Sequence, residues 1–324
     1  MTVNIVTKRI KNKKGAEMKK RVVLGMSGGV DSSVAAILLR EQGYDVIGVT
    51  LKLWETECVD DAKRVCEHLR IPHYTMDLKE QFNKHVVEYF IRTYADCKTP
   101  NPCIECNRFL KFDQMYKKAI ELNADYMATG HYAKTEFSNE YNKYVLKKSK
   151  AGKKDQSYVL YCIQKEFLSK TIFPLGDFED KEEIRKIAKE NGLEVASKPD
   201  SEDICFIPDG DYKKFLTANS YIEKRKGDIV DIDGNILGKH NGLYNYTIGQ
   251  RKGMGIAHAN PLYVIRLDAQ NNKLVVGEEK DLYKSEIEVE QVRFLLIDEI
   301  TEPIKVRAKI RYSSKEATRN NLQN

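Results

Sequence analysis

The sequence predicts an α/β protein with a parallel-sheet domain, a small β-rich linking domain and a partial C-terminal β-barrel. From residue 21 to about residue 130, short β-branched segments alternate with amphipathic segments of helical length. This rhythm is typical of a parallel sheet with crossover helices. From about residue 206 onward, short strand-like segments alternate with turns that contain Gly and Asn, such as Asp233-Gly234-Asn235 and Gln270-Asn271-Asn272. This pattern of short segments and turns predicts β-structure.

The elements of the parallel-sheet domain follow from its apolar periodicity. Gly43 is expected to end the first helix. Strands are expected at residues 21–25, 45–50, 73–76 and 126–129, and helices at residues 31–42, 60–70, 80–95 and 107–122. Ligands of parallel sheets bind beyond the carboxyl ends of the strands, where the loops that carry Ser27, Cys103 and His131 are expected.

The length and the charge distribution indicate several parts. A chain of 324 residues with 41% hydrophobic content can bury a sizeable core but exceeds one ordinary domain. The net charge of +6 lies entirely in residues 1–20, which hold seven basic residues and one acidic residue. Bulk charge therefore predicts no partner for the rest. We expect a basic extension, disordered or an upstream mis-start, then the parallel-sheet domain, the linking domain and a shortened barrel. These parts are expected at residues 1–18, 19–205, 206–265 and 266–324.

The cysteines indicate a reducing compartment. Seven cysteines occur without an apolar signal sequence, and no segment approaches the roughly 20 apolar residues that span a bilayer. We therefore expect a cytoplasmic protein with no membrane partner, whose thiols serve chemistry or metal binding. Cys58, Cys66, Cys97 and Cys162 lie in helical or mixed apolar segments and are expected to be ordinary buried residues.

A glycine-rich loop follows the first predicted strand, with the sequence Ser27-Gly28-Gly29-Val30-Asp31-Ser32. Paired glycines let the backbone approach a phosphate, and the N-terminus of the following helix adds its positive end. The Walker pattern and the dinucleotide fingerprint do not fit, because the loop lacks their lysine and their glycine spacing. It is similar to the Ser-Gly-Gly-x-Asp-Ser signature of ATP pyrophosphatases, which cleave ATP to AMP and pyrophosphate. The alternative is a plain turn capped by Asp31.

Two further loops carry cysteines. The proline-rich segment 99–107 is expected to lead into a helix at residue 107, which puts Cys106 at the helix N-terminus. The N–H groups there stabilise a thiolate, so Cys106 is a candidate reactive residue. Cys205 lies in another loop far along the chain, and the two thiols could meet over the phosphate loop.

Taken together, these segments resemble one family, the bacterial and organellar tRNA-specific 2-thiouridylases. The resemblance extends from residue 19 to about residue 312. Besides the phosphate loop, the matching segments occur in the family's order at residues 99–102, 128–132, 154–158, 197–201, 205–207 and 246–251. Argininosuccinate, GMP and lysidine synthetases are similar only in the phosphate loop.

The resemblance implies a chemistry of sulfur transfer. ATP, with Mg²⁺, adenylates the 2-oxygen of the wobble uridine and thereby makes that oxygen a leaving group. Cys205 carries a persulfide, a strong nucleophile, and Cys106 helps to release the sulfur by closing a transient disulfide with Cys205. The ATP-binding residues implied in this way are Gly25, Met26, Ser27, Gly28, Gly29, Val30, Asp31, Ser32, Leu51 and Gly130.

The resemblance also implies contacts with tRNA. Asn101, Pro102 and Cys103 would face the uridine, which must be flipped out of the anticodon stack to be reached. The other implied contacts are His131, Lys154, Asp155, Gln156, Arg311 and Tyr312. Structural alternatives remain: a satisfied polar residue at a strand end for His131, a solvated basic turn for Lys154, and barrel packing for Arg311 and Tyr312. The implied partners are glutamate, glutamine and lysine tRNAs, and a cysteine desulfurase or sulfur-relay protein.

Two features depart from the family's pattern. Many members have an aspartate where this chain has Cys103, so Cys103, Cys106 and Cys205 could converge and hold a [4Fe-4S] cluster as the sulfur carrier. The persulfide route and the cluster route both stay open. Residues 313–324 are expected to be a polar tail without a strand, which leaves the barrel incomplete. Rival functions are an amidating synthetase and a non-catalytic RNA-binding protein.

Overall fold

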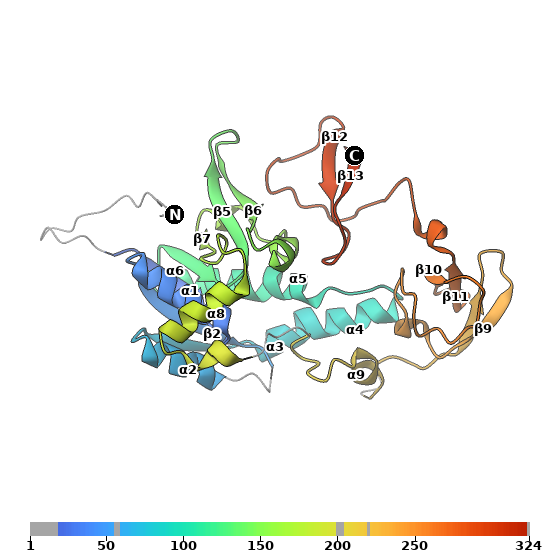
Figure 1. The fold of residues 1–324 in the computed structure, drawn as a ribbon, viewed down its shortest axis with the longest axis horizontal. Coiled ribbons are helices and arrows are strands. Elements are labelled where there is room, and N and C mark those ends of the chain that lie inside the picture. Colours follow the sequence, from blue (N-terminus) through green and yellow to red (C-terminus); the bar gives the residue numbers. More distant parts are fainter. Residues whose placement is uncertain (1–18, 55–58, 199–203, 219–220, 323–324) are drawn as a thin grey trace, which may run out of the picture. The chain divides into compact units, whose positions relative to one another are not determined.

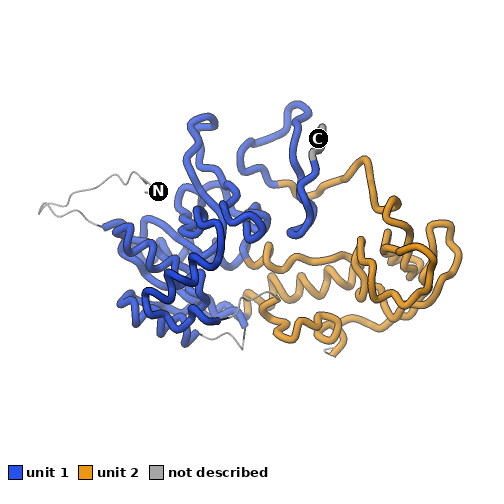
Figure 2. Tube along the Cα trace, in the orientation of Figure 1, with its two compact units in different colours: residues 1–79, 107–200, 293–324 blue, residues 80–106, 201–292 orange. Residues whose placement is uncertain are grey.

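The computed structural model describes residues 19–54, 59–198, 204–218 and 221–322. The chain divides into two compact units, which Figure 2 distinguishes by colour. The first unit consists of residues 1–79, 107–200 and 293–324, and the second of residues 80–106 and 201–292. The units are thus built from alternating segments, whereas the sequence suggests parts that follow one another. Residues 1–18, predicted to be an extension, lie outside the described residues.

A five-stranded sheet forms the centre of the first unit, and β2 and β7 in Figure 1 belong to it. Its strand order is β3-β2-β1-β4-β7. All neighbouring strands run parallel, so the predicted parallel sheet is confirmed. Val22, Val23 and Leu24 of the central strand have no exposed surface, as expected for a parallel strand covered on both faces. The strands are β1 (Arg21–Gly25), β2 (Asp45–Lys52), β3 (His73–Asp77), β4 (Tyr126–Thr129) and β7 (Thr171–Ile172).

Helices cover both faces of this sheet. Val22 and Leu24 belong to one core cluster together with residues of α1, α2 and α8, while Val23 belongs to a second cluster with residues of α6 and α7. This division follows from the alternation of side chains along a strand. Gly43 ends α1 as predicted, with a φ of +89° that favours glycine. The helices are α1 (Val30–Glu41), α2 (Val59–His68), α6 (Asp113–Glu121), α7 (Lys165–Leu168) and α8 (Lys181–Glu190).

Two antiparallel ribbons complete the first unit. β5 (Ala133–Ser138) pairs with β6 (Lys143–Lys148), and β12 (Ile304–Ala308) pairs with β13 (Ala317–Leu322). The prediction that residues 313–324 contain no strand is therefore wrong. A two-stranded ribbon is held by backbone pairing and needs no apolar face, so a polar sequence gives no periodic signal for it.

The second unit contains a four-stranded sheet in the order β10-β11-β8-β9. Both predicted turns are confirmed, since Asp233-Gly234-Asn235 joins β8 to β9 and Gln270-Asn271-Asn272 joins β10 to β11. The domain boundary expected at residue 265 falls inside β10, and the sheet that contains β10 continues through β11. The strands are β8 (Gly227–Val230), β9 (Ile236–His240), β10 (Tyr263–Asp268) and β11 (Lys273–Gly277).

The helical segments of residues 79–121 differ from the prediction at one end. The helix predicted over residues 80–95 is confirmed and consists of α3 (Lys79–Phe82), a π-helical turn and α4 (Glu88–Ala95). The helix expected to begin at residue 107 begins at Pro102, because α5 (Pro102–Cys106) and a π-helical segment precede α6. Proline is favoured at the first helical position, because the N–H group that it lacks would have no hydrogen-bond partner within the helix there. Farther along, α9 (Tyr212–Ala218) lies in the second unit. Among the described helices, none has the length and apolar character needed to span a bilayer.

Candidate active site

The loop after β1 has the backbone of a phosphate-binding loop. Gly28 has a φ of +75°, which favours glycine, and a Cβ added there would lie 2.8 Å from the Cβ of Asp61. Gly29 is the N-cap of α1 and supplies no side-chain cap. The hydroxyl oxygens of Ser27 and Ser32 lie 3.2 Å apart, and the Ser32 hydroxyl donates to the carbonyl of Gly29 at 3.1 Å. The result is a tight turn of small residues at the positive end of a helix, which suits a phosphate group.

Asp31 joins three elements at this loop. It does not cap α1, whose N-cap is Gly29, so the capping role that the alternative gave to Asp31 is wrong. Its carboxylate accepts a hydrogen bond from the Tyr132 hydroxyl at 2.8 Å and one from the Lys181 ammonium at 2.9 Å. Tyr132 follows β4 and Lys181 begins α8, so both are fixed against the start of α1. Tyr132 lies in a matching family segment, whereas no sequence signal marks Lys181.

The residues predicted to surround ATP lie at one edge of the sheet. β1 pairs with β2 on one side and with β4 on the other, so the loop after β1, Leu51 near the end of β2 and Gly130 after β4 are neighbours. A Cβ added to Gly130 would lie 2.9 Å from the backbone carbonyl carbon of Asp31 and 2.9 Å from the backbone nitrogen of Ser32. Only glycine allows this approach. The structure thus brings together the residues predicted to bind ATP, although they lie far apart in the sequence.

A buried carboxylate lies beneath the phosphate loop and was not recognised from the sequence. Asp61, in the first turn of α2, has a side chain that is only 9% exposed. It accepts hydrogen bonds from the Arg64 guanidinium and the Lys198 ammonium. Two cations therefore face one carboxylate beside Gly28, which leaves a net positive charge near the loop. Lys198 belongs to a matching family segment, but an aspartate in the first turn of a helix is too common to stand out.

The two cysteines of the proline-rich loop have different environments. Cys103 lies in the first turn of α5 and is exposed, whereas Cys106 is the last residue of α5 and is 6% exposed. The expectation that Cys106 occupies a helix N-terminus is therefore wrong, because the helix begins at Pro102. Ile104 is buried beside them, and its backbone N–H donates to the carbonyl of Asn101 at 3.2 Å.

Cys205 is exposed, and the residues that follow it fix its position. Phe206 is buried among three aromatic rings, with centroid distances of 5.6 Å to Phe82, 5.3 Å to Phe90 and 5.5 Å to Phe215. The next residue, Ile207, is also buried. This cluster lies within the second unit and presents the Cys205 thiol to solvent on an anchored backbone. The Cys-Phe-Ile segment thus combines an exposed thiol with an apolar support.

The thiols do not form a metal site in the described residues. No group of three or more His, Cys, Asp or Glu residues there could hold a metal ion, so Cys103, Cys106 and Cys205 do not converge as expected for a cluster. No disulfide joins any of the described cysteines. Cys66 and Cys162 are buried, as predicted, and burial raises the pKa of Cys66 to about 12. Cys97 is half-buried, and Cys58 lies outside the described residues.

Two of the segments predicted to contact tRNA lie side by side in the first unit. The Tyr312 hydroxyl donates to the backbone carbonyl of Lys153 at 3.0 Å, next to the exposed Lys154. The Lys309 ammonium lies 5.1 Å from the ring centroid of Tyr312 and 5.9 Å from that of Tyr158. Arg311, the other predicted contact, is also exposed, in the loop between β12 and β13. A basic surface with exposed rings suits the phosphates and bases of RNA.

The neighbours of Lys154 serve the local structure. Asp155 is buried, and its carboxylate accepts a hydrogen bond from the backbone N–H of Ser149 at 2.8 Å. The side-chain carbonyl of Gln156 accepts one from the backbone N–H of Tyr132 at 2.9 Å. These bonds shape the basic turn and connect it to the segment after β4. A tRNA contact through Asp155 or Gln156 stays a prediction.

His131 is held between aromatic rings. Its Nδ1 lies 2.8 Å from the Thr129 hydroxyl, and its ring centroid lies 6.2 Å from that of Phe112 and 6.3 Å from that of Phe173. Burial lowers the pKa of His131 to about 3, and Lys111 acts in the same direction. The imidazole is therefore neutral near pH 7. Its hydrogen bond to Thr129 agrees with the alternative of a satisfied polar residue. A base contact by the neutral ring stays a prediction.

Comparison with known proteins identifies the family. The model of the tRNA methyl transferase HUP domain matches residues 20–209, and that of the tRNA methyl transferase PRC-barrel domain matches residues 213–278. The chain is 50% identical over 311 residues to the tRNA-specific 2-thiouridylase MnmA of Clostridioides difficile, which covers 92% of this chain and 86% of that protein. It is 50% identical over 314 residues to MnmA of Clostridium kluyveri, with 93% and 87% covered. The chain therefore belongs to the tRNA-specific 2-thiouridylase family.

Proposed function

We propose that the protein catalyses the ATP-dependent 2-thiolation of the wobble uridine, position 34, of tRNA. The observation that carries this proposal is the combination of a phosphate loop with an exposed, anchored Cys205 in a chain that is 50% identical to 2-thiouridylases. An ATP pyrophosphatase that forms an amide has no use for such a thiol. A protein that only binds RNA has no use for a phosphate loop.

The first step is adenylation of the base. The 2-oxygen of the uridine attacks the α-phosphorus of ATP, the bond to pyrophosphate breaks, and AMP becomes attached to that oxygen. The turn from Ser27 to Ser32 would hold the phosphates through its backbone N–H groups and the end of α1. Lys198, which pairs with Asp61 next to Gly28, would offset part of the charge of the leaving pyrophosphate. Mg²⁺ would arrive bound to the phosphates of ATP.

The second step is sulfur transfer. The outer sulfur of a persulfide on Cys205 attacks C2 of the uridine, and AMP leaves with the oxygen. The Cys106 thiolate then attacks the sulfur of Cys205, the bond between the two sulfurs breaks, and the base keeps the outer sulfur. The Cys106–Cys205 disulfide that results needs an external thiol as reductant before the next cycle. Asn101, Pro102 and Cys103 would face the flipped base, and the surface around Lys154 and Arg311–Tyr312 would hold the tRNA.

A [4Fe-4S] cluster is the other sulfur carrier to be tested. We favour the persulfide because the described residues provide no group that could hold a metal. Anaerobic purification followed by iron and sulfide analysis is expected to find no stoichiometric iron. About four irons per chain would instead support the cluster.

The partners follow from the same chemistry. We propose that the substrates are glutamate, glutamine and lysine tRNAs, and that a cysteine desulfurase supplies the sulfur directly or through a relay protein. The reaction needs reduced thiols, which is why we assign the protein to the cytoplasm. We also propose that residues 19–205 carry the catalysis, while the residues that follow support the grip on tRNA.

Pyrophosphate release that depends on tRNA tests the function. The purified protein with ATP is expected to release pyrophosphate when tRNA is added, and to form 2-thiouridine when a persulfide donor is also present. Release with an amino acid and without tRNA would instead identify an amidating synthetase. Mass spectrometry of the product nucleoside distinguishes replacement of oxygen by sulfur from addition of a methyl group, the reaction that the names of the two matching family models suggest. Cells that lack the gene should lose the wobble 2-thiouridine.

A further inference from the structure

We infer that the second unit binds an unpaired nucleotide of the tRNA in a hollow formed by residues 251–262, and that this nucleotide is not the uridine to be thiolated. The hollow belongs to the segment that begins with the family-like sequence Tyr246 to Arg251, to which the reaction itself assigns no role. The inference rests on the proposed function, because it takes tRNA to be the substrate.

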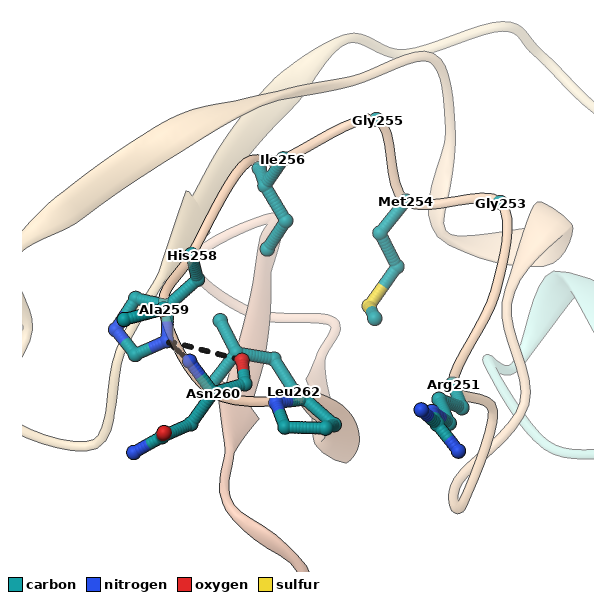
Figure 3. A pocket seen from close by; sticks show the side chains of 10 residues that line it. Arg251, Gly253, Met254, Gly255, Ile256, His258, Ala259, Asn260 and Leu262 are labelled. Atoms are coloured by element: carbon teal, nitrogen blue, oxygen red, sulfur yellow. Dashed lines mark hydrogen bonds between the residues drawn. The ribbon is translucent and has the colours of Figure 1, made fainter.

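The hollow has the size and lining of a nucleotide site. Its volume is about 330 Å³, at the lower end of the roughly 300–1,000 Å³ of ligand pockets. Figure 3 shows apolar side chains in its middle, between a guanidinium at one end and an imidazole and an amide at the other. These residues are Met254, Ile256 and Leu262 in the middle, Arg251 at one end, and His258 and Asn260 at the other.

Glycines and short backbone bonds form the loop around the hollow. Gly249, Gly253 and Gly255 have φ values of +86°, +82° and +70°, which favour glycine. The backbone N–H of Gly249 donates to the carbonyl of Val264 at 2.8 Å, and that of Val264 donates to the carbonyl of Gln250 at 2.9 Å. These two bonds fasten the loop to β10. The hollow is thus largely formed before a ligand binds, which lowers the entropic cost of binding.

The charge of the hollow favours an anion. Arg251, Lys252 and His258 are exposed in the loop, and the lining contains no carboxylate. In the described part of the chain, the Arg251 guanidinium has no hydrogen-bonding or ion-pair partner. The nearby carboxylate of Glu278 accepts a hydrogen bond from the Asn260 amide at 2.8 Å. The five N–H donors of Arg251 are therefore available to a phosphate.

The mixture of charge and apolar surface identifies the class of ligand. A free phosphate would use only the guanidinium end and leave Ile256, His258 and Asn260 without a contact. A nucleotide in a duplex could present its phosphate but not the face of its base. An unpaired nucleotide can place its phosphate at Arg251 and its base against the partly exposed Ile256 and the exposed imidazole of His258.

The hollow and the cysteine loop rest on the same part of the second unit. The Thr99 hydroxyl, at the start of the cysteine loop, donates to the Thr247 hydroxyl at 3.2 Å. Cys97 packs against the core cluster that contains Met254 and Leu262. A tRNA whose uridine faces the cysteine loop therefore has other nucleotides within reach of the hollow. Occupation of the hollow would help to hold the flipped anticodon.

The test compares two arginines of the second unit by their effect on RNA binding. Arg251→Ala should weaken binding of an unmodified tRNA transcript by about tenfold, and the slope of log Kd against log salt should fall by about one. Arg251→Lys should restore most of the slope. The control is Arg266→Ala on β10, which removes an exposed arginine that pairs with Asp268; its binding should stay within about twofold of wild type.

Two further measurements distinguish the possible ligands. An unpaired oligonucleotide should compete for wild-type protein better than a duplex of the same length, and this preference should disappear in the Arg251→Ala variant. Binding of ATP should not change in that variant. Equal tRNA affinity of Arg251→Ala and wild type would overturn the inference, as would a loss confined to ATP. If wild-type protein binds no tRNA at all, the proposed function fails together with this inference.

Discussion

At Gly28 and Gly130, the absence of a side chain lets separate segments of the first unit touch. A Cβ at Gly28 would collide with Asp61, and a Cβ at Gly130 would collide with the backbone of Asp31 and Ser32. The phosphate loop is therefore shaped by its neighbours α2 and β4 as much as by its own sequence. The sequence signature predicted the tight turn, but it could not predict Asp61, because that contact depends on where α2 lies.

Gly130→Ala should damage the nucleotide site more than the fold. The new Cβ would lie 2.9 Å from backbone atoms of Asp31 and Ser32, so the start of α1 must shift. We expect ATP binding to weaken by at least about tenfold, with a loss of about 1–3 kcal/mol in the free energy of unfolding. Isothermal titration with ATP and urea unfolding measure the two effects.

Gly43→Ala is the matched control for this substitution. Gly43 has a φ of +89° and no atom within 4 Å of an added Cβ, so alanine there costs about 1 kcal/mol of conformational strain and leaves ATP binding intact. Equal ATP affinities of the two variants would contradict the role given to Gly130.

His131 should make the stability of the protein depend on pH. Burial lowers its pKa from 6.5 to about 3. Below pH 6.5 the unfolded chain binds a proton at this residue and the folded chain does not, so the free energy of unfolding falls as the pH falls. The contribution is at most about 1.4 kcal/mol per pH unit. Between pH 7 and pH 5, wild type should therefore lose about 1–2 kcal/mol more than His131→Gln in urea unfolding. Parallel losses, or the same difference for the exposed His258→Gln, would contradict the assignment.

At the scale of an element, α5 decides which thiols are accessible. The sequence predicted both cysteines of this region as candidates but not their environments. The helix begins at Pro102, so Cys103 lies in its exposed first turn and Cys106 lies one turn later, where the side chains face the interior. A proline within a loop and a proline at the first position of a helix look alike in a sequence. The start of α5 could therefore not be predicted from the pattern.

Alkylation should separate the thiols by burial. Cys103 and Cys205 are exposed, so we expect iodoacetamide to modify them at least about tenfold faster than Cys106, which reacts only after local opening. Cys66 should be the slowest, because burial raises its pKa to about 12. Peptide mass spectrometry over a time course measures the rates, and the same course in urea should abolish the differences. Equal rates for Cys103 and Cys106 in the folded protein would contradict this account of α5.

The elements most predictable from the sequence are those with a buried face. β1, β2 and β4 are continuous apolar runs and α2 has an apolar face, because the core fixes these patterns. The turn residues of the second unit are equally distinct. β7 has only two residues and β13 has a polar sequence, so neither leaves a pattern to read. The aromatic cluster around Phe206, which supports Cys205, could not be predicted from the sequence for another reason. Phe82 and Phe90 are far from it in the sequence, and only the fold brings their rings together.

For the whole molecule, the important feature is that the chain alternates between the two units. The phosphate loop belongs to the first unit, while Cys103, Cys106 and Cys205 belong to the second. The segment that ends at Cys106 is followed directly by first-unit residues. Consecutive domains are the natural assumption when only a sequence is available, because exchange of segments between compact units leaves no mark in composition.

This division predicts that the two chemical steps can be separated by mutation. Cys205→Ser removes the sulfur carrier but leaves every residue of the first unit in place, so tRNA-dependent release of pyrophosphate should continue for at least one turnover while 2-thiouridine falls below detection. Gly28→Ala forces a side chain against Asp61 and should abolish both products. Cys162→Ser, at a buried cysteine outside the proposed chemistry, is the control and should retain both activities. Pyrophosphate and 2-thiouridine are quantified in the same samples, and the ratio of the two products shows whether adenylation proceeds without sulfur transfer. If Cys205→Ser lost pyrophosphate release as completely as Gly28→Ala, adenylation would depend on the persulfide, and the two-step order proposed here would be wrong.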